Sequence, residues 1–145
     1  MNTVPEEVTV VTGASRGLGK TIALELAEAG ARLVCVATQA GNAADTVAEI
    51  EAKGGEAIAL GCHVEVADEV TRLFAHVEEQ LGPVDILVNN VGITRPQLTL
   101  EMTEENWDQH MDINAKSIFL CSQAAARQMK AHGAGCIIHI GSILG

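Results

Sequence analysis

The sequence predicts an α/β domain with a Rossmann-type fold, in which helices cover both faces of one doubly wound parallel sheet. The first observation is that short apolar segments alternate with segments of helical periodicity along the whole chain. The second is composition: 48% of the 145 residues are hydrophobic, yet there are only two Phe, one Trp and no Tyr. A core of Ala, Val, Ile and Leu is typical of strands buried on both faces. The third is a glycine-rich turn between the first strand and the first helix.

Five strands and four helices are expected to alternate. Short apolar runs predict the strands at 9–12, 32–37, 56–62, 86–89 and 136–140. Helical spacing of apolar residues predicts the helices at 17–29, 43–53, 68–81 and 104–130. Because parallel crossovers are right-handed, we expect the strand order 3-2-1-4-5. Residues 1–145 are therefore expected to form one domain around this sheet.

Local signals support the helices and their ends. Apolar residues at helical spacing form one buried stripe on the third helix: Val70, Leu73, Phe74, Val77 and Leu81. A glycine follows each of the first three helices, where a left-handed residue is favoured: Gly30, Gly54 and Gly82. Thr103 is expected to cap the fourth helix.

Several apolar surfaces are expected to remain without a neighbour in the domain. The fifth strand would be an apolar sheet edge. One face of the fourth helix would lack a packing partner: Ile118, Cys121, Ala125 and Met129. Another stripe, formed by Trp107, Met111 and Ile118, is interpreted as packing or a contact between subunits. These surfaces predict a homo-oligomer.

The net charge of −10 argues against nucleic acid and anionic membranes as partners, because both would repel the chain. No apolar run is long enough to span a membrane or to form a signal-peptide core. The cysteines stand singly and are expected to be buried free thiols in a reducing cytosol: Cys35, Cys62, Cys121 and Cys136. The histidines lack metal-ligand spacing, so no metal site is expected. A cytoplasmic protein is expected.

The turn between the first strand and the first helix contains three glycines, and each is expected to have a different structural role. Gly13 allows a tight turn, Gly17 allows the backbone to approach a phosphate, and Gly19 allows the helix to pack closely on the strand. The helix that follows points its unpaired N–H groups and the positive end of its dipole at the same place. The turn therefore predicts an anion site, although a tight turn that binds nothing fits this loop alone equally well.

A second polar segment is expected beside the glycine loop. Residues 89–92, with the sequence Asn-Asn-Val-Gly, end the fourth strand. In a doubly wound sheet, ligands bind beyond the carboxyl ends of the strands, where the strand order reverses. The first and fourth strands flank that point, so the two segments are predicted to meet there.

Four motifs in this order resemble the short-chain dehydrogenase/reductase family, and the resemblance covers the whole chain. The segment 12–19 matches the pattern T-G-x-x-x-G-x-G, and residues 89–92 resemble the family's N-N-A-G. Residues 112–114 match D-x-N, and Gly141-Ser142 resembles the serine that follows the fifth strand. The loop 91–95 is similar to the branch of 3-oxoacyl-(acyl-carrier-protein) and acetoacetyl-CoA reductases.

The resemblance implies that residues 1–145 form one dinucleotide-binding domain, incomplete at its C-terminus, with a sheet truncated after the fifth strand. It also implies site residues. Cofactor binding is implied for Gly13, Ser15, Arg16, Gly17, Leu18, Gly19, Thr38, His63, Val64, Asn90, Val91 and Gly92. Asn114 would hold a helix bend and the water of a proton relay, and Ser142 would hydrogen-bond the substrate carbonyl. The chain departs from the family at His63, where Asp or Asn is usual, and at Val91, where Ala is usual. It also lacks the family's Tyr-x-x-x-Lys base, since it contains no Tyr.

The end of the second strand bears on the choice of cofactor. An acid there would bind the ribose 2′-hydroxyl of NAD, but residues 37–40 are Ala-Thr-Gln-Ala. Arg16 in the glycine loop can pair with a 2′-phosphate, although a solvated loop charge is an equally good interpretation. We therefore expect NADP in preference to NAD.

These observations predict the cofactor half of an NADP-dependent oxidoreductase. Hydride would pass between NADPH and a small-molecule carbonyl or acyl thioester, such as a 3-oxoacyl thioester. Without the Tyr-x-x-x-Lys segment, the chain by itself is expected to be inactive. The alternative is a non-catalytic nucleotide-binding or assembly module.

Overall fold

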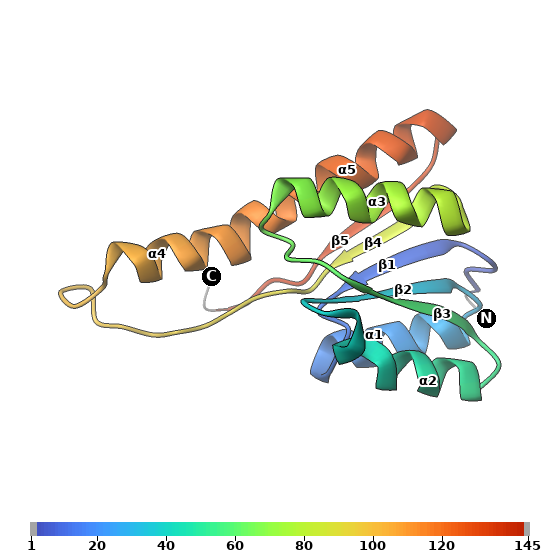
Figure 1. Ribbon diagram of the computed structural model, residues 1–145, viewed down its shortest axis with the longest axis horizontal. Coiled ribbons are helices and arrows are strands. Elements are labelled where there is room, and N and C mark those ends of the chain that lie inside the picture. Colours follow the sequence, from blue (N-terminus) through green and yellow to red (C-terminus); the bar gives the residue numbers. More distant parts are fainter. Residues whose placement is uncertain (1–2, 144–145) are drawn as a thin grey trace.

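The computed structural model describes residues 3–143 and confirms the doubly wound α/β fold (Figure 1). The strands are β1 (Val8–Thr12), β2 (Arg32–Ala37), β3 (Glu56–Gly61), β4 (Ile86–Asn89) and β5 (Cys136–His139). They form one parallel sheet in the order β3-β2-β1-β4-β5, as the sequence predicts. The reversal of strand order falls between β1 and β4, whose carboxyl ends therefore flank the expected ligand position.

The helices differ from expectation mainly in the second half of the chain. They are α1 (Gly17–Glu28), α2 (Ala44–Ala52), α3 (Ala67–Leu81), α4 (Glu104–Met111) and α5 (Ser117–His132). A 3₁₀ turn (Ala40–Ala43) precedes α2. The helix predicted at 104–130 is present as one helical run from Glu104 to His132, but a π-helical turn (Asp112–Lys116) inside it divides the run into α4 and α5. The Thr103 cap is confirmed: its hydroxyl oxygen accepts a hydrogen bond from the backbone N–H of Asn106 at 3.1 Å.

Helices cover both faces of the sheet, as Figure 1 shows. An apolar layer packs between the helices and the sheet on each face. On one face, Val10 of β1 and Leu87 of β4 are fully buried in the layer beneath α3 and α5. On the other face, Val11 and Leu33 are fully buried in the layer beneath α1 and α2. Burial of each such side chain contributes about 1.5–3 kcal/mol. This packing fixes the ends of β1 and β4.

Two expectations about exposed surfaces are wrong. Cys121, Ala125 and Met129 do not lack a packing partner, because they are buried in the layer between α5, α3 and the sheet. Conversely, Cys136 is exposed rather than buried. It lies on β5, an edge of the sheet among residues 3–143. The neighbouring Ile137 packs into the α3–α5 layer, so Cys136 and Ile138 face the opposite side of the sheet, where both are exposed.

No helix within residues 3–143 combines the length and the apolar character needed to cross a membrane. The three thiols of Cys35, Cys62 and Cys121 are buried and free, as the sequence predicts.

Candidate functional site: a cavity at the switch point of the sheet

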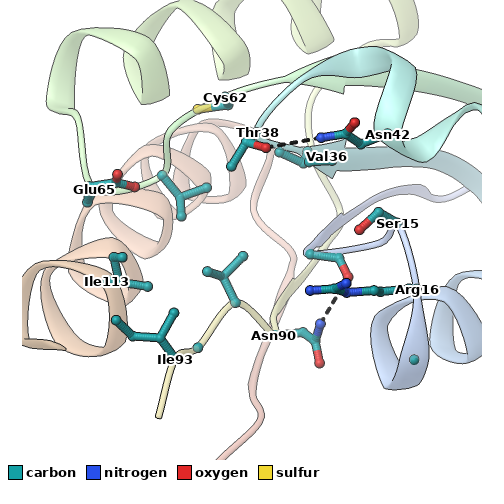
Figure 2. Close-up of a pocket in the computed structure, with 16 residues that line it drawn as sticks. Ser15, Arg16, Val36, Thr38, Asn42, Cys62, Glu65, Asn90, Ile93 and Ile113 are labelled. Carbon is teal, nitrogen blue, oxygen red and sulfur yellow. Dashed lines mark hydrogen bonds between the residues drawn. The ribbon is translucent and has the colours of Figure 1, made fainter. Parts of the chain in front are cut away.

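A cavity of about 780 Å³ lies beyond the carboxyl ends of the strands, at the place where the strand order reverses. Its lining comes from the glycine loop, the end of β2, the segment after β3 and the segment after β4 (Figure 2). Nine residues expected at a cofactor site line it: Gly13, Ser15, Arg16, Gly17, Thr38, Val64, Asn90, Val91 and Gly92. The fold therefore brings residues distant in sequence to one opening large enough for a small molecule.

The three glycines of the loop differ in their surroundings. Gly13 has a φ of +67°, and a β-carbon on it would lie 2.9 Å from the side-chain nitrogen of Asn90. Gly17 has a φ of +56°, and a β-carbon on it would meet nothing within 4 Å. Gly19 does not line the cavity, and a β-carbon there would overlap the carbonyl oxygen of Gly13. The loop thus contains a tight turn, an open approach to the backbone, and a close helix contact.

The first turn of α1 opens onto the same cavity. Arg16 is its N-cap residue, and the Arg16 side chain makes no capping hydrogen bond to the helix. Backbone N–H groups of a first helical turn have no partner within the helix, and the dipole makes this end positive. Leu18 belongs to this turn, but its side chain is 55% exposed and does not line the cavity. Any contribution of Leu18 to a ligand therefore comes from its backbone.

Thr12 and Asn90 join the ends of β1 and β4. The buried Thr12 hydroxyl oxygen accepts hydrogen bonds from the backbone N–H groups of Asn90 (3.0 Å) and Val91 (3.3 Å). The side-chain amide of Asn90 donates to the carbonyl oxygens of Thr12 (3.1 Å) and Gly13 (3.3 Å). These reciprocal contacts fix the glycine loop relative to the segment that follows β4.

Comparison with known proteins shows which family has this fold and these motifs. Residues 7–145 match the family described as short chain dehydrogenase. The chain belongs to the short-chain dehydrogenase family. It is 44% identical to a 3-oxoacyl-[acyl-carrier-protein] reductase of Synechocystis, covering 100% of this chain and 59% of that protein. It is also 44% identical to the corresponding reductase FabG of Staphylococcus aureus, covering 94% of this chain and 56% of that protein.

A solved structure agrees with these relatives. A short-chain type dehydrogenase/reductase from Mycobacterium marinum superposes with a TM-score of 0.95 at 36% identity. The superposition covers 97% of this chain and 57% of that protein. The chain thus spans little more than half the length of the short-chain dehydrogenases it matches.

Asn114, the residue of the family's D-x-N motif, lies in the π-helical turn. Its side-chain oxygen accepts from the backbone N–H of Ile93 at 2.8 Å, and its side-chain nitrogen donates to the carbonyl oxygen of Ile93 at 2.9 Å. Ser117 donates to the carbonyl oxygen of Ile113 at 2.5 Å, one turn back along the helix. The widened turn therefore coincides with an amide that holds the segment after β4.

Ser142 follows β5, is exposed, and is not among the residues that line the cavity. Its assignment to substrate binding stays a prediction. Within the described part of the chain, no group of three or more His, Cys, Asp or Glu residues is arranged to hold a metal ion.

His63 does not line the cavity, although Cys62 and Val64 on either side do. Glu69 accepts hydrogen bonds from the backbone N–H of His63 (2.7 Å) and interacts with its ring nitrogen Nδ1 (3.1 Å). The backbone hydrogen bond, followed by the side-chain contact, holds the pKa of Glu69 below its usual value. The exposed ring of His63 thus contacts Glu69 on α3, and a role for His63 in cofactor binding stays a prediction.

Sequence reasoning missed seven residues that line the cavity: Val36, Ala37, Asn42, Cys62, Glu65, Ile93 and Ile113. The ends of β2 and β3 could have indicated Val36, Ala37 and Cys62, because ligands bind where strands end. Burial raises the pKa of the Cys62 thiol to about 11, so this residue offers an apolar surface rather than a nucleophile. Figure 2 shows Glu65 and Ile113 across the cavity from Arg16.

Proposed function

We propose that this chain is the cofactor-binding part of an NADPH-dependent reductase of the short-chain dehydrogenase family, acting on 3-oxoacyl thioesters. The observation that carries the proposal is the joining of the glycine loop, the α1 N-terminus and Asn90 around one cavity. The names of the 44%-identical relatives support the substrate class. Small-molecule carbonyls in general, including ketones, fit the same reaction.

The residues around the cavity fit a dinucleotide. Gly17 leaves open space in front of the backbone, and the first turn of α1 supplies N–H donors for a pyrophosphate. Val64 and Ile113 supply apolar surface suited to a base, while Asn90, Val91 and Gly92 would line the channel toward the nicotinamide. Val91 lines the cavity and also packs partly against the apolar layer beneath α3 and α5, so its extra bulk relative to alanine narrows the space near the cofactor.

The preference for NADP over NAD rests on charge. Among the described residues lining the cavity, Arg16 is the only basic one and Glu65 the only acidic one. Neither Ala37, the last residue of β2, nor residues 38–43 after it include an acid that would bind a ribose hydroxyl and repel a 2′-phosphate. Arg16 is exposed and can pair with a phosphate through its planar guanidinium.

For the reaction, a bound nicotinamide dinucleotide supplies or accepts the hydride. We assign to Ser142 a hydrogen bond to the substrate carbonyl, and to Asn114 the positioning of Ile93 and of a relay water. Neither a serine hydroxyl nor an amide releases a proton near neutral pH. These 145 residues contain no Tyr, and by themselves they are proposed to reduce carbonyls far more slowly than a complete family member.

The net charge of the chain bears on whether the acyl group is carried by coenzyme A or by an acyl carrier protein. An acidic carrier protein needs a basic surface, and the chain carries a net charge of −10. Arg127 and Lys130 near the end of α5 offer positive charge, whereas His132 is paired with Asp85 at 3.3 Å. We therefore propose acyl-CoA thioesters as substrates alongside the acyl thioesters of an acyl carrier protein.

We also propose that the protein is a homo-oligomer in the cytoplasm, without nucleic-acid or membrane partners. Trp107 and Met111 on α4 and Phe119 on α5 are 57%, 46% and 59% exposed. Large exposed apolar side chains on neighbouring helices favour a subunit contact. The buried free thiols fit a reducing compartment. Sedimentation of wild type and Trp107→Ser tests the contact, which the substitution should weaken.

A non-catalytic nucleotide-binding module is the second candidate. It is favoured by one observation: Ser142 is not among the residues lining the cavity. Both candidates predict cofactor binding, so only turnover separates them.

The experiment compares NADPH consumption with acetoacetyl-CoA by this chain alone and by the chain extended with the C-terminal part of a related reductase. Activity is expected only for the extended chain, and Ser142→Ala should reduce it by about 10²–10³-fold. An extended chain that binds NADPH but shows no turnover would favour the module. Rapid turnover by the 145-residue chain would contradict the assignment of the proton donor.

A further inference from the structure

Two polar side chains lie together at the rim of the cavity, beside the end of β2. Thr38 directly follows β2, and Asn42 lies in the 3₁₀ turn that precedes α2. Both line the cavity, and the side-chain nitrogen of Asn42 donates a hydrogen bond to the Thr38 hydroxyl oxygen at 3.2 Å (Figure 2). No sequence motif indicates Asn42.

The direction of this hydrogen bond determines what Thr38 offers to a ligand. An amide nitrogen donates only, whereas a hydroxyl both donates and accepts. Because the Thr38 oxygen accepts from Asn42, the Thr38 proton points elsewhere and can be donated into the cavity. A donor is the partner that a phosphate requires, since phosphate oxygens accept. Recognition of a ribose 2′-hydroxyl instead uses a carboxylate acceptor at this place.

The turn that carries this pair is held in place by its neighbours. The backbone N–H of Asn42 donates to the carbonyl oxygen of Gln39 at 3.0 Å. Cys62 donates its backbone N–H to the carbonyl oxygen of Ala37 at 2.8 Å. A β-carbon on Gly61 would lie 3.1 Å from the backbone nitrogen of Ala40, so the absence of a side chain lets β3 approach the turn closely. The backbone that carries the two exposed side chains is therefore held in place before any ligand arrives.

We propose that Asn42 is a positioning residue that sets the preference for a 2′-phosphorylated dinucleotide, by orienting the Thr38 hydroxyl as a donor. The inference rests on the proposed function and goes beyond it, because it assigns the selectivity to a hydrogen-bond direction rather than to Arg16 alone.

Asn42→Asp tests the direction with little change of shape. A carboxylate only accepts, so the Thr38 proton would turn toward residue 42, and a negative charge would be added at the rim. The ligands are 2′,5′-ADP and 5′-AMP, which differ only in the 2′-phosphate, and their dissociation constants are measured by calorimetry. The ratio of the two constants should fall about 100-fold in favour of 5′-AMP. Asn42→Ala should change the ratio about 5-fold.

Matched variants separate positioning from structure. Thr38→Val should reduce the preference for 2′,5′-ADP about 5-fold, and Thr38→Ser should keep it. Gln39→Glu adds the same charge to the same turn at a residue that does not line the cavity, and should change the ratio by less than about 3-fold because of screening. The unfolding midpoint of each variant checks that the fold is intact.

The outcomes separate the inference from the function on which it rests. If wild type and Asn42→Asp bind both ligands with an unchanged ratio, the inference is wrong while nucleotide binding stands. If Asn42→Asp does not fold, Thr38→Val takes its place: an unchanged ratio of the two dissociation constants in that variant would also show that the inference is wrong. Binding of neither ligand to wild type would overturn the proposed function and this inference together.

Discussion

The hydroxyl of Thr12 and the amide of Asn90 hold each other's backbone across the switch point of the sheet. Thr12 accepts from the backbone N–H of Asn90 at 3.0 Å, and the Asn90 side chain donates to the carbonyl oxygen of Thr12 at 3.1 Å. The glycine loop and the segment after β4 therefore take their relative position from one pair of polar side chains. This role gives a structural reason for a polar residue at the buried end of β1.

Thr12→Val removes the hydroxyl while keeping the shape of the side chain. The backbone N–H groups of Asn90 and Val91 would lose their acceptor near the core, which should lower the free energy of unfolding by about 1–3 kcal/mol. Urea denaturation measures this loss, with Thr12→Ser as the control that keeps the acceptor. Equal stability of Thr12→Val and wild type would mean that the pair does not hold the two segments.

Gly17→Ala should separate binding from stability. The positive φ of +56° makes alanine unfavourable by about 1–2 kcal/mol, and its methyl group would enter the open space in front of the helix. We expect the affinity for NADPH to fall more than about 10-fold, since a phosphate could no longer approach the backbone. Calorimetry measures the affinity, and denaturation measures the stability.

Gly54→Ala is the matched control for that substitution. Gly54 has a φ of +85°, and a β-carbon there also meets nothing within 4 Å, but it follows α2 and does not line the cavity. The control should lose similar stability and bind NADPH as wild type does. An equal loss of affinity in both variants would show that backbone strain, rather than the phosphate approach, weakens binding.

Thiol reactivity should distinguish the four cysteines. Burial raises the pKa of Cys35 and Cys121 to about 12 and that of Cys62 to about 11, so each is protonated at neutral pH. Because the thiolate is the reactive form, only the exposed Cys136 should react rapidly with a disulfide reagent. All four thiols should react after denaturation, and Cys136→Ser should abolish the rapid phase. A second rapid thiol in the folded protein would contradict the described burial.

The sequence was sufficient for features that depend on local pattern. Strand β2 and strand β4 have the predicted bounds, because each is an apolar run bounded by polar or turn residues. Val70, Leu73, Phe74 and Val77 are buried along α3, as helical periodicity predicts. The glycine loop and residues 89–92 meet as expected, since the strand order follows from crossover handedness.

Features that depend on contacts between residues distant in sequence could not be predicted from local pattern. The π-helical turn accompanies a pair of hydrogen bonds between the Asn114 side chain and the backbone of Ile93, a residue 21 positions earlier, while the apolar pattern of a helix continues through the turn. Exposure of Cys136 depends on its place at the sheet edge rather than on its apolar neighbours. Asn42 reaches the cavity through a 3₁₀ turn that no periodicity indicates.

The central claim, that the cavity binds NADPH, is tested most directly by calorimetric titration of wild type and Arg16→Ala with NADPH and NADH. We predict that wild type binds NADPH more tightly than NADH. The substitution should weaken NADPH binding about 10–100-fold, because it removes a charge-assisted hydrogen bond, and should leave NADH binding nearly unchanged. Equal affinities for the two cofactors in wild type, unaltered by Arg16→Ala, would contradict the account.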